Sequence, residues 1–153
     1  NFAFDIIDLV DKLYLIECDE KWIHALKYTF EPYKDKVEIV EAVLGDGSHG
    51  SATIDGIVGE NRIDFIKMDI EGAESRALHG AEQSLKRNNV KLDVCAYHNF
   101  DDEEKIKKLL ETFGYQTEVS EGYMVFTERL LESETAFPRF VRGMVRGRKN
   151  GNP

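Results

Sequence analysis

Short strand-like segments of apolar residues alternate with helical patterns along most of this chain. Such alternation favours a parallel sheet flanked by helices, because each strand needs a crossover before the next parallel strand can pair with it. We therefore predict an α/β fold with a mostly parallel sheet. The predicted strands are LYLIE at 13–17, KVEIV at 36–40, the segment 62–68 and KLDVCAY at 91–97.

Local signals predict three helices, two of them by the residues where they begin and end. Asp19 can cap a helix that Pro32 helps to end. Asp101 and Glu104 form a capping-box-like start for a later helix, which ends at Gly114. The helix between these two carries its apolar face on Ala73, Ala77, Leu78, Ala81 and Leu85.

The residue pattern of the C-terminal part predicts a hairpin and a last strand, and this part ends in a basic tail. YQTEVS and YMVF flank Glu121-Gly122 as hairpin strands, and FPRFVRGMVRGRK adds a strand before a disordered end at 150–153. The basic residues can meet an anionic acceptor or a membrane surface. We favour the simpler interpretation, a solvated edge strand whose charges prevent edge-to-edge pairing. They are Arg139, Arg142, Arg146, Arg148 and Lys149.

Length and composition indicate one globular domain, residues 1–153, and exclude some partners. Apolar residues make up 42% of the chain, too many for a disordered protein. The net charge of −9 disfavours a nucleic-acid partner, because phosphates would be repelled. No apolar run approaches the roughly 20 residues of a membrane span. Cys18 and Cys95 lack metal-binding spacing and predict a reducing, cytoplasmic location.

Ionisable residues follow the predicted strands at the point where each strand ends. They are Glu17, Glu41, Asp69 and His98. In sheets of this kind, ligands bind outside the carboxyl ends of the strands. The sequence therefore predicts a binding site formed by these residues.

The segment DFIKMDIEGAE at 64–74, with LYLIECDEKW, ALHGAEQSLK and VCAYHNFDD around it, resembles the FkbM-type methyltransferases. The resemblance runs from about residue 13 to about residue 126. It implies a Rossmann-like methyltransferase fold and an S-adenosylmethionine-dependent O-methyltransferase. The implied acceptor is a hydroxyl of a sugar, a glycan or a natural product.

The sequence departs from the family pattern at its beginning. The family starts with a strand and a glycine-rich turn that wraps the cofactor, and residue 1 falls where the next helix should begin. We expect that the N-terminal portion of the domain is missing here, because a sheet without its central strand would leave two interior edges unpaired. Residues 127–153 match the family loosely, as a C-terminal extension or a last strand and tail.

The resemblance implies cofactor-binding roles for three residues. Glu17 takes the position of the acid that accepts hydrogen bonds from both ribose hydroxyls, as in dinucleotide sites. Glu41 and Ala42 take the position that borders the adenine ring. Each acid can instead be a solvated residue at a strand end.

The catalytic candidates are Asp69, Glu71 and His98. Methyl transfer to a hydroxyl needs an aligned acceptor oxygen that loses its proton, and histidine is the usual base near neutral pH. We predict that Asp69 positions cofactor and acceptor, and that His98 is the base or binds the acceptor. Glu71 can act like Asp69, although the helix dipole also favours an acid there. Gly72 should permit a tight turn, and Glu74 is predicted to be a helix-surface acid.

Asp69, Glu71 and His98 can also hold a divalent cation such as Mg²⁺ or Mn²⁺, so a metal is an open alternative that we do not predict. Two other function classes compete with the enzyme. A Rossmann-like module without the glycine turn can bind a partner or nucleoside without catalysis. A phosphate-receiver domain is disfavoured, because it pairs two adjacent acids after its first strand, and Glu17 and Asp19 do not match that pattern.

Overall fold

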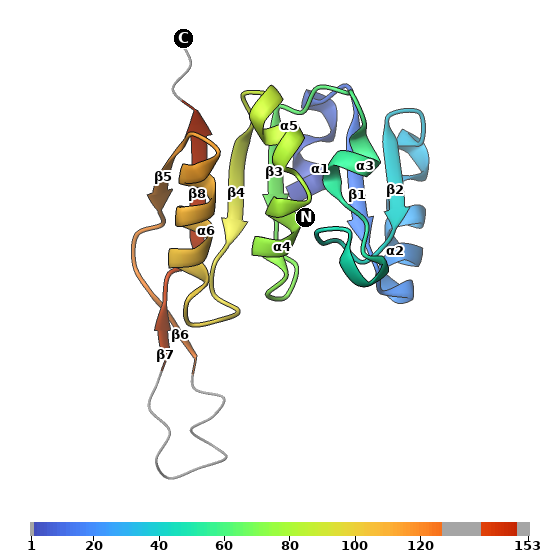
Figure 1. Cartoon of the computed structure of the whole chain (residues 1–153). Coiled ribbons are helices and arrows are strands. Elements are labelled where there is room, and N and C mark those ends of the chain that lie inside the picture. The colour runs from blue at the N-terminus through green and yellow to red at the C-terminus, as the bar shows by residue number, and fades with distance from the viewer. Residues whose placement is uncertain (1, 127–138, 150–153) are drawn as a thin grey trace. The chain divides into compact units, whose positions relative to one another are not determined.

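The computed structural model describes residues 2–126 and 139–149. The chain divides into two compact units, residues 1–44 and 45–153. Figure 1 shows their helices and strands along the chain. The single-domain assignment stays a prediction.

The first unit is a parallel pair of strands with two α-helices and two short 3₁₀ helices. Strand β1 (Leu13–Glu17) pairs in register with β2 (Val37–Glu41), so that Glu17 lies opposite Glu41. Asp19 caps α2 through its side chain, which accepts a hydrogen bond from the backbone N–H of Lys21 at 2.8 Å, as predicted. Ile7, Phe30 and Val37 form the buried core. The helical elements are α1 (Phe2–Ile6), η1 (Ile7–Leu9), α2 (Glu20–Phe30) and η2 (Glu31–Tyr33).

The second unit is built on a four-stranded sheet in the order β3-β4-β8-β5. Strands β3 (Phe65–Met68) and β4 (Lys91–Cys95) are parallel. Strand β8 (Met144–Lys149) runs antiparallel between β4 and β5 (Tyr115–Val119). A separate pair joins β6 (Met124–Phe126) and β7 (Arg139–Val141). The helices are η3 (Ser48–Gly50), α3 (Ile54–Val58), α4 (Glu74–His79), α5 (Glu82–Arg87) and α6 (Asp102–Thr112).

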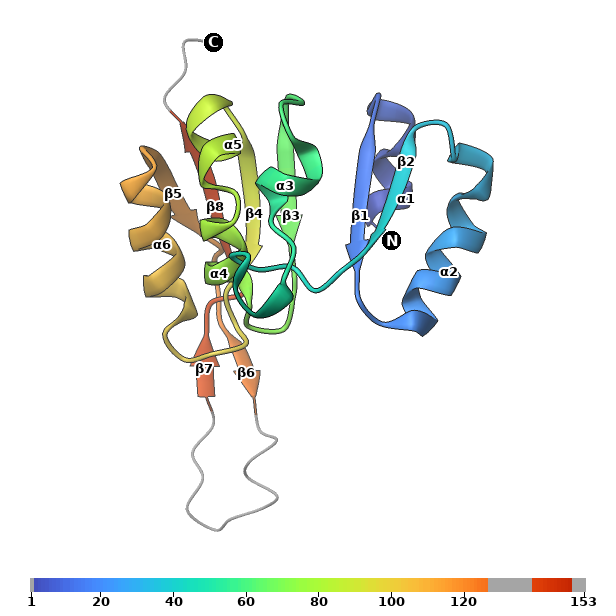
Figure 2. The same ribbon diagram turned by 45° about the vertical axis from the view of Figure 1, so that its right-hand side comes forward.

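Helices α4, α5 and α6 lie on one face of this sheet, as Figure 2 shows. The alternation of side chains along the strands explains the packing: Leu92 and Gly147 face the helices, and a Cβ on Gly147 would lie 3.2 Å from Leu110. Asp93 and Arg146 point to the other face, where they form an ion pair at 3.4 Å. The core beneath the helices consists of Leu78, Leu85, Leu92, Val94, Ile106, Leu110 and Val145.

The predicted order of strands and helices is confirmed for β1 to β4, and three local predictions are wrong. The helix predicted after Gly72 is two helices, because the chain turns at Gly80, where a Cβ would lie 2.1 Å from the carbonyl oxygen of Gly45. Asp101 makes no side-chain cap hydrogen bond and instead pairs with Lys105 at 2.8 Å. The predicted hairpin does not form, because β5 pairs with β8 and β6 with β7.

The edge-strand interpretation of the basic tail is also wrong. Strand β8 is an interior strand with a neighbour on each side. The predicted disordered end at 150–153 lies outside the described residues. Among the residues that the structure describes, no helix has the length and apolar character needed to cross a membrane.

Candidate functional site

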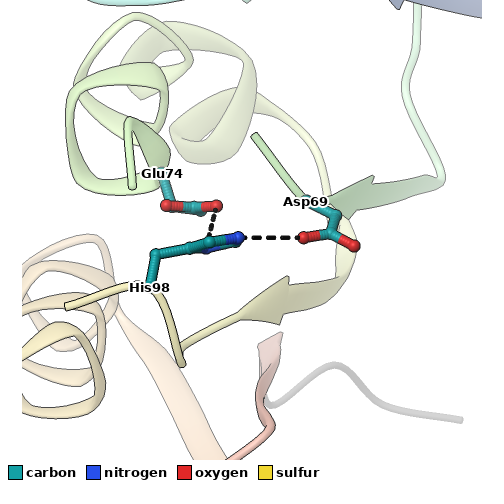
Figure 3. Close-up of side chains that lie close together, drawn as sticks. All are labelled: Asp69, Glu74 and His98. Atoms are coloured by element: carbon teal, nitrogen blue, oxygen red, sulfur yellow. Dashed lines mark ion pairs between the residues drawn. The ribbon is translucent and has the colours of Figure 1, made fainter. Parts of the chain in front are cut away.

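The candidate site lies at the carboxyl ends of β3 and β4. These strands are parallel neighbours, with Met68 opposite Val94. The segments that follow them therefore leave the sheet side by side, and His98 Nε2 lies 3.5 Å from Asp69 Oδ1. Figure 3 shows the two side chains facing each other. The structure thus brings together the two residues that the sequence placed at neighbouring strand ends.

A tight turn after β3 places Glu71 beside the same histidine. The N–H of Ala73 donates to the carbonyl oxygen of Ile70, and both central residues have positive φ, 56° at Glu71 and 92° at Gly72. A Cβ on Gly72 would lie 2.7 Å from Asn99 Nδ2, so glycine also permits the close approach of the loop after β4. Glu71 Oε2 lies 3.5 Å from His98 Nε2.

Glu74 is a buried member of this site, so the prediction that it is a surface acid is wrong. Its side chain is 1% exposed, and its Oε1 lies 3.1 Å from His98 Nδ1. The same oxygen accepts a hydrogen bond from the N–H of Ile70 at 2.9 Å. Glu74 is one helical turn before the buried Ala77 and Leu78, and this spacing is the signal in the sequence that could have identified it.

Tyr97 connects the site to β6. Its hydroxyl donates to Asp69 Oδ1 at 2.9 Å, and its ring lies 4.3 Å from the His98 ring and 5.9 Å from Phe126, centroid to centroid. Burial, followed by the hydrogen bond to Asp69, raises the pKa of the Tyr97 hydroxyl. The hydroxyl therefore remains protonated near neutral pH and acts as a donor. The sequence pattern alone predicts no role for Tyr97.

Cys95 ends β4 behind the site and is a buried free thiol. Burial, together with the negative charge of Asp69, raises the pKa of this thiol to about 11. A thiol with such a pKa is neutral at physiological pH and is a poor nucleophile. Cys95 therefore has a packing role beside the site and is not a candidate nucleophile.

Three side chains of the site have the ligand types of a metal centre. One ligand atom from each of Asp69, Glu74 and His98 lies within 4.8 Å of the others. However, Glu74 approaches Nδ1 of the imidazole and Asp69 approaches Nε2. An ion bound to one ring nitrogen would not meet both carboxylates at these positions. In the alternative set of Asp69, Glu71 and His98, both carboxylates lie 3.5 Å from Nε2, but the three ligand atoms do not come within 4.8 Å of one another.

Three of the four predicted cofactor-binding residues lie in the first unit, each with a local partner, and the fourth, Asp69, lies in the second. Glu17 is half-buried, and its Oε1 accepts hydrogen bonds from the N–H groups of Cys18 at 2.7 Å and Asp19 at 2.9 Å. Glu41 forms a surface ion pair with Lys27. The N–H of Ala42 donates to the carbonyl oxygen of Glu17 at 3.0 Å.

Three basic residues of the tail make contacts within the chain. Arg142 donates to the carbonyl oxygen of Gly122 at 2.9 Å, and Arg146 pairs with Asp93. Lys149 donates to the carbonyl oxygen of Lys86 at 3.0 Å, at the end of α5, and burial lowers its pKa. These contacts are structural. A groove of about 790 Å³ along the sheet, lined in part by Phe65, Asp93 and Arg146, contains none of the predicted site residues.

The fold is that of the Rossmann-like methyltransferases. A methyltransferase FkbM from Methylobacillus flagellatus has a TM-score of 0.65 at 22% identity over 89% of this chain. A precorrin-6y C5,15-methyltransferase from Geobacter metallireducens has a TM-score of 0.57 at 15% identity over 90% of the chain, which spans 67% of that protein. An S-adenosylmethionine-dependent O-methyltransferase from Thermotoga maritima has a TM-score of 0.56 at 14% identity over 93% of the chain, which spans 51% of that protein. At these identities the likeness shows the fold.

A family model also matches part of the sequence. Residues 50–121 match the methyltransferase FkbM domain, and the resemblance to the FkbM methyltransferases is thereby confirmed. The matched stretch contains Asp69, Glu74 and His98, whereas Glu17 and Glu41 lie outside it. The chain spans only 36% of the FkbM structure. No curated protein sequence matches the chain significantly.

Proposed function

We propose that this protein is an S-adenosylmethionine-dependent O-methyltransferase that acts on a hydroxyl of a sugar, a glycan or a natural product. The observation that supports it most is the cluster of Asp69, Tyr97, His98 and Glu74 inside the stretch that matches the FkbM domain. A histidine that faces an acid at the ligand-binding edge of a parallel sheet has the composition expected of a proton-transfer site.

Glu17 is the proposed ribose-binding residue. Its carboxylate is oriented by two backbone N–H groups that both bind Oε1. A carboxylate has about four acceptor positions, so the group can accept two further hydrogen bonds from ribose hydroxyls. These acceptor positions suit the hydroxyls of a nucleoside and are unsuited to a phosphate, which the carboxylate repels. Glu41 and Ala42, at the end of the neighbouring strand, would border the adenine ring.

His98 is the proposed general base. S-adenosylmethionine, when bound, would supply the methyl group from its sulfonium, whose sulfur–methyl bond breaks to leave the neutral thioether S-adenosylhomocysteine. The acceptor oxygen forms the new bond to carbon, and His98 takes the hydroxyl proton at Nε2, on the edge of the ring that faces Asp69 and Glu71. Asp69, held by the Tyr97 hydroxyl, orients the acceptor hydroxyl through its second oxygen. Correct alignment of the two reactants is a large part of the rate enhancement in such transfers.

The test is methyl transfer from S-adenosylmethionine that carries an isotopically labelled methyl group. The protein is incubated with a panel of glycans and hydroxylated metabolites, and acceptors are analysed by mass. We expect one labelled methyl group on a hydroxyl oxygen of at least one acceptor class. Cofactor binding by calorimetry without transfer to any acceptor would contradict the proposal and favour the non-catalytic binding module.

A further inference from the structure

We infer that Glu74 is a positioning residue for His98 and provides the negative charge that stabilises the imidazolium when His98 takes the acceptor proton. This inference rests on the proposed role of His98 as a base. The sequence predicts a catalytic role for Glu71 and a surface position for Glu74, whereas this inference gives Glu74 the larger role.

Burial separates the three carboxylates around His98. Their side chains are 1% exposed at Glu74, 42% at Asp69 and 92% at Glu71. The interaction between two charges strengthens as water is excluded, and solvent screens an exposed pair. Glu71 and Asp69 also lie at 3.5 Å from the ring, whereas Glu74 lies at 3.1 Å. Both factors make Glu74 the strongest partner of a positive charge on His98.

Glu74 is also held in place by the backbone of the turn after β3. The N–H of Ile70, in the turn after β3, donates to the same Oε1 that contacts the imidazole. The carboxylate therefore connects the turn after β3, the start of α4 and the segment after β4. Figure 3 shows it against the imidazole on a different side from Asp69.

A buried carboxylate needs a counter-charge or hydrogen bonds to be stable. Among the described residues, Oε2 of Glu74 is buried and has no hydrogen-bond partner, and the ion-pair contact of Glu74 is with His98. The imidazolium is the cation that matches this group. When the proton of the acceptor hydroxyl moves to Nε2, the positive charge forms next to a carboxylate that is already oriented, which lowers the cost of the transfer.

The test compares Glu74→Gln with Glu82→Gln. The two acids occupy the same position, the first residue of α4 and of α5, but Glu82 is 45% exposed and pairs with Lys86. We expect Glu74→Gln to reduce kcat by about 10–10²-fold with unchanged acceptor KM and cofactor affinity. Glu82→Gln should change none of these. A folded Glu74→Gln protein with wild-type kcat would overturn the inference.

A second readout does not depend on activity. The imidazole NMR signals of His98, assigned by their loss in His98→Ala, should shift in Glu74→Gln and stay in place in Glu82→Gln. Unshifted signals in Glu74→Gln would overturn the inference. Shifted signals in a protein without methyl transfer would instead contradict the proposed function and leave the contact established. If Glu74→Gln does not fold, Glu74→Met has a similar length without a buried amide and replaces it.

Discussion

The strand ends of the two units carry similar acidic residues in different surroundings. In the first unit, Glu17 binds the backbone that directly follows it, and Glu41 pairs with Lys27 on the surface. In the second unit, Asp69 and His98 contact each other across two strands, and Tyr97 and the buried Glu74 support them. The first arrangement is local, and the second depends on the tertiary fold.

This difference leads us to expect different roles for the strand ends of the first unit and those of the second. Carboxylates oriented by local backbone and open to solvent suit the binding of hydroxyl groups. A half-buried histidine between carboxylates suits proton transfer, because partial burial strengthens electrostatic effects. We therefore expect variants of the first unit to change cofactor affinity and variants of the second to change the rate.

The largest expected effect is at the end of β4. His98→Ala and Asp69→Asn should each reduce kcat by ~10²–10⁴-fold, because a positioned base contributes about that much. Both variants should remain folded and keep the cofactor affinity of the wild type. Asp69→Asn should keep the melting temperature, whereas His98→Ala should lower it, because it removes the ion-pair partner of the buried Glu74. His79→Ala, at an exposed position in α4, is the control and should have wild-type kcat. Variants that melt early but turn over normally when folded would show that Asp69 and His98 are structural.

The next effect concerns the end of β1. Glu17→Ala should weaken S-adenosylmethionine binding by about 10–100-fold, the equivalent of a hydrogen-bonded charged group. The rate at saturating cofactor should recover, in contrast with His98→Ala. The matched control is Glu38→Ala. Glu38 lies in β2, and its substitution removes a surface ion pair with Lys12. Calorimetry measures both; unchanged affinity in Glu17→Ala would mean that Glu17 only orders Cys18 and Asp19.

A smaller effect on stability distinguishes the turn after β3 from an ordinary glycine turn. Gly72→Ala should lower the free energy of unfolding by about 2–3 kcal/mol, because it adds a clash with Asn99 to the strain of positive φ. Gly114, after the end of α6, also has a positive φ, but a Cβ there would meet open space. Gly114→Ala should therefore lower the free energy of unfolding by only about 1 kcal/mol. Urea denaturation measures both. Equal losses would mean that Asn99 moves aside easily.

The smallest effect compares the two thiols. Cys18, exposed after β1, should react with a thiol reagent at pH 8, whereas buried Cys95 should react only on unfolding. The raised pKa of Cys95 also makes the free energy of unfolding depend on pH. The thiol has a pKa near 8.5 in the unfolded chain and about 11 in the folded protein. The contribution of the neutral Cys95 thiol to the free energy of unfolding is therefore fully present below pH 8.5 and declines as the pH rises toward 11. Rapid modification of both thiols in the folded protein would contradict this.

Much of the fold could be predicted from local sequence signals, but the site could be predicted only in part. Strand patterns and strand ends located Asp69 and His98, since parallel neighbours place their ends together. The partners of β5 and β6 could not be read locally, because strand pairing depends on distant segments. The spacing of Glu74 from Ala77 and Leu78 is a local signal of its burial, but its contact with His98, 24 positions further along the chain, depends on the tertiary fold.

The most direct test of the central claim is chemical rescue of His98→Ala. If His98 at the end of β4 takes the acceptor proton, added imidazole should restore part of the lost rate in His98→Ala. It should not restore the rate of Asp69→Asn, which keeps its own imidazole. Methyl transfer by His98→Ala that does not depend on the imidazole concentration, or equal rescue of Asp69→Asn, would contradict the claim that His98 is the base.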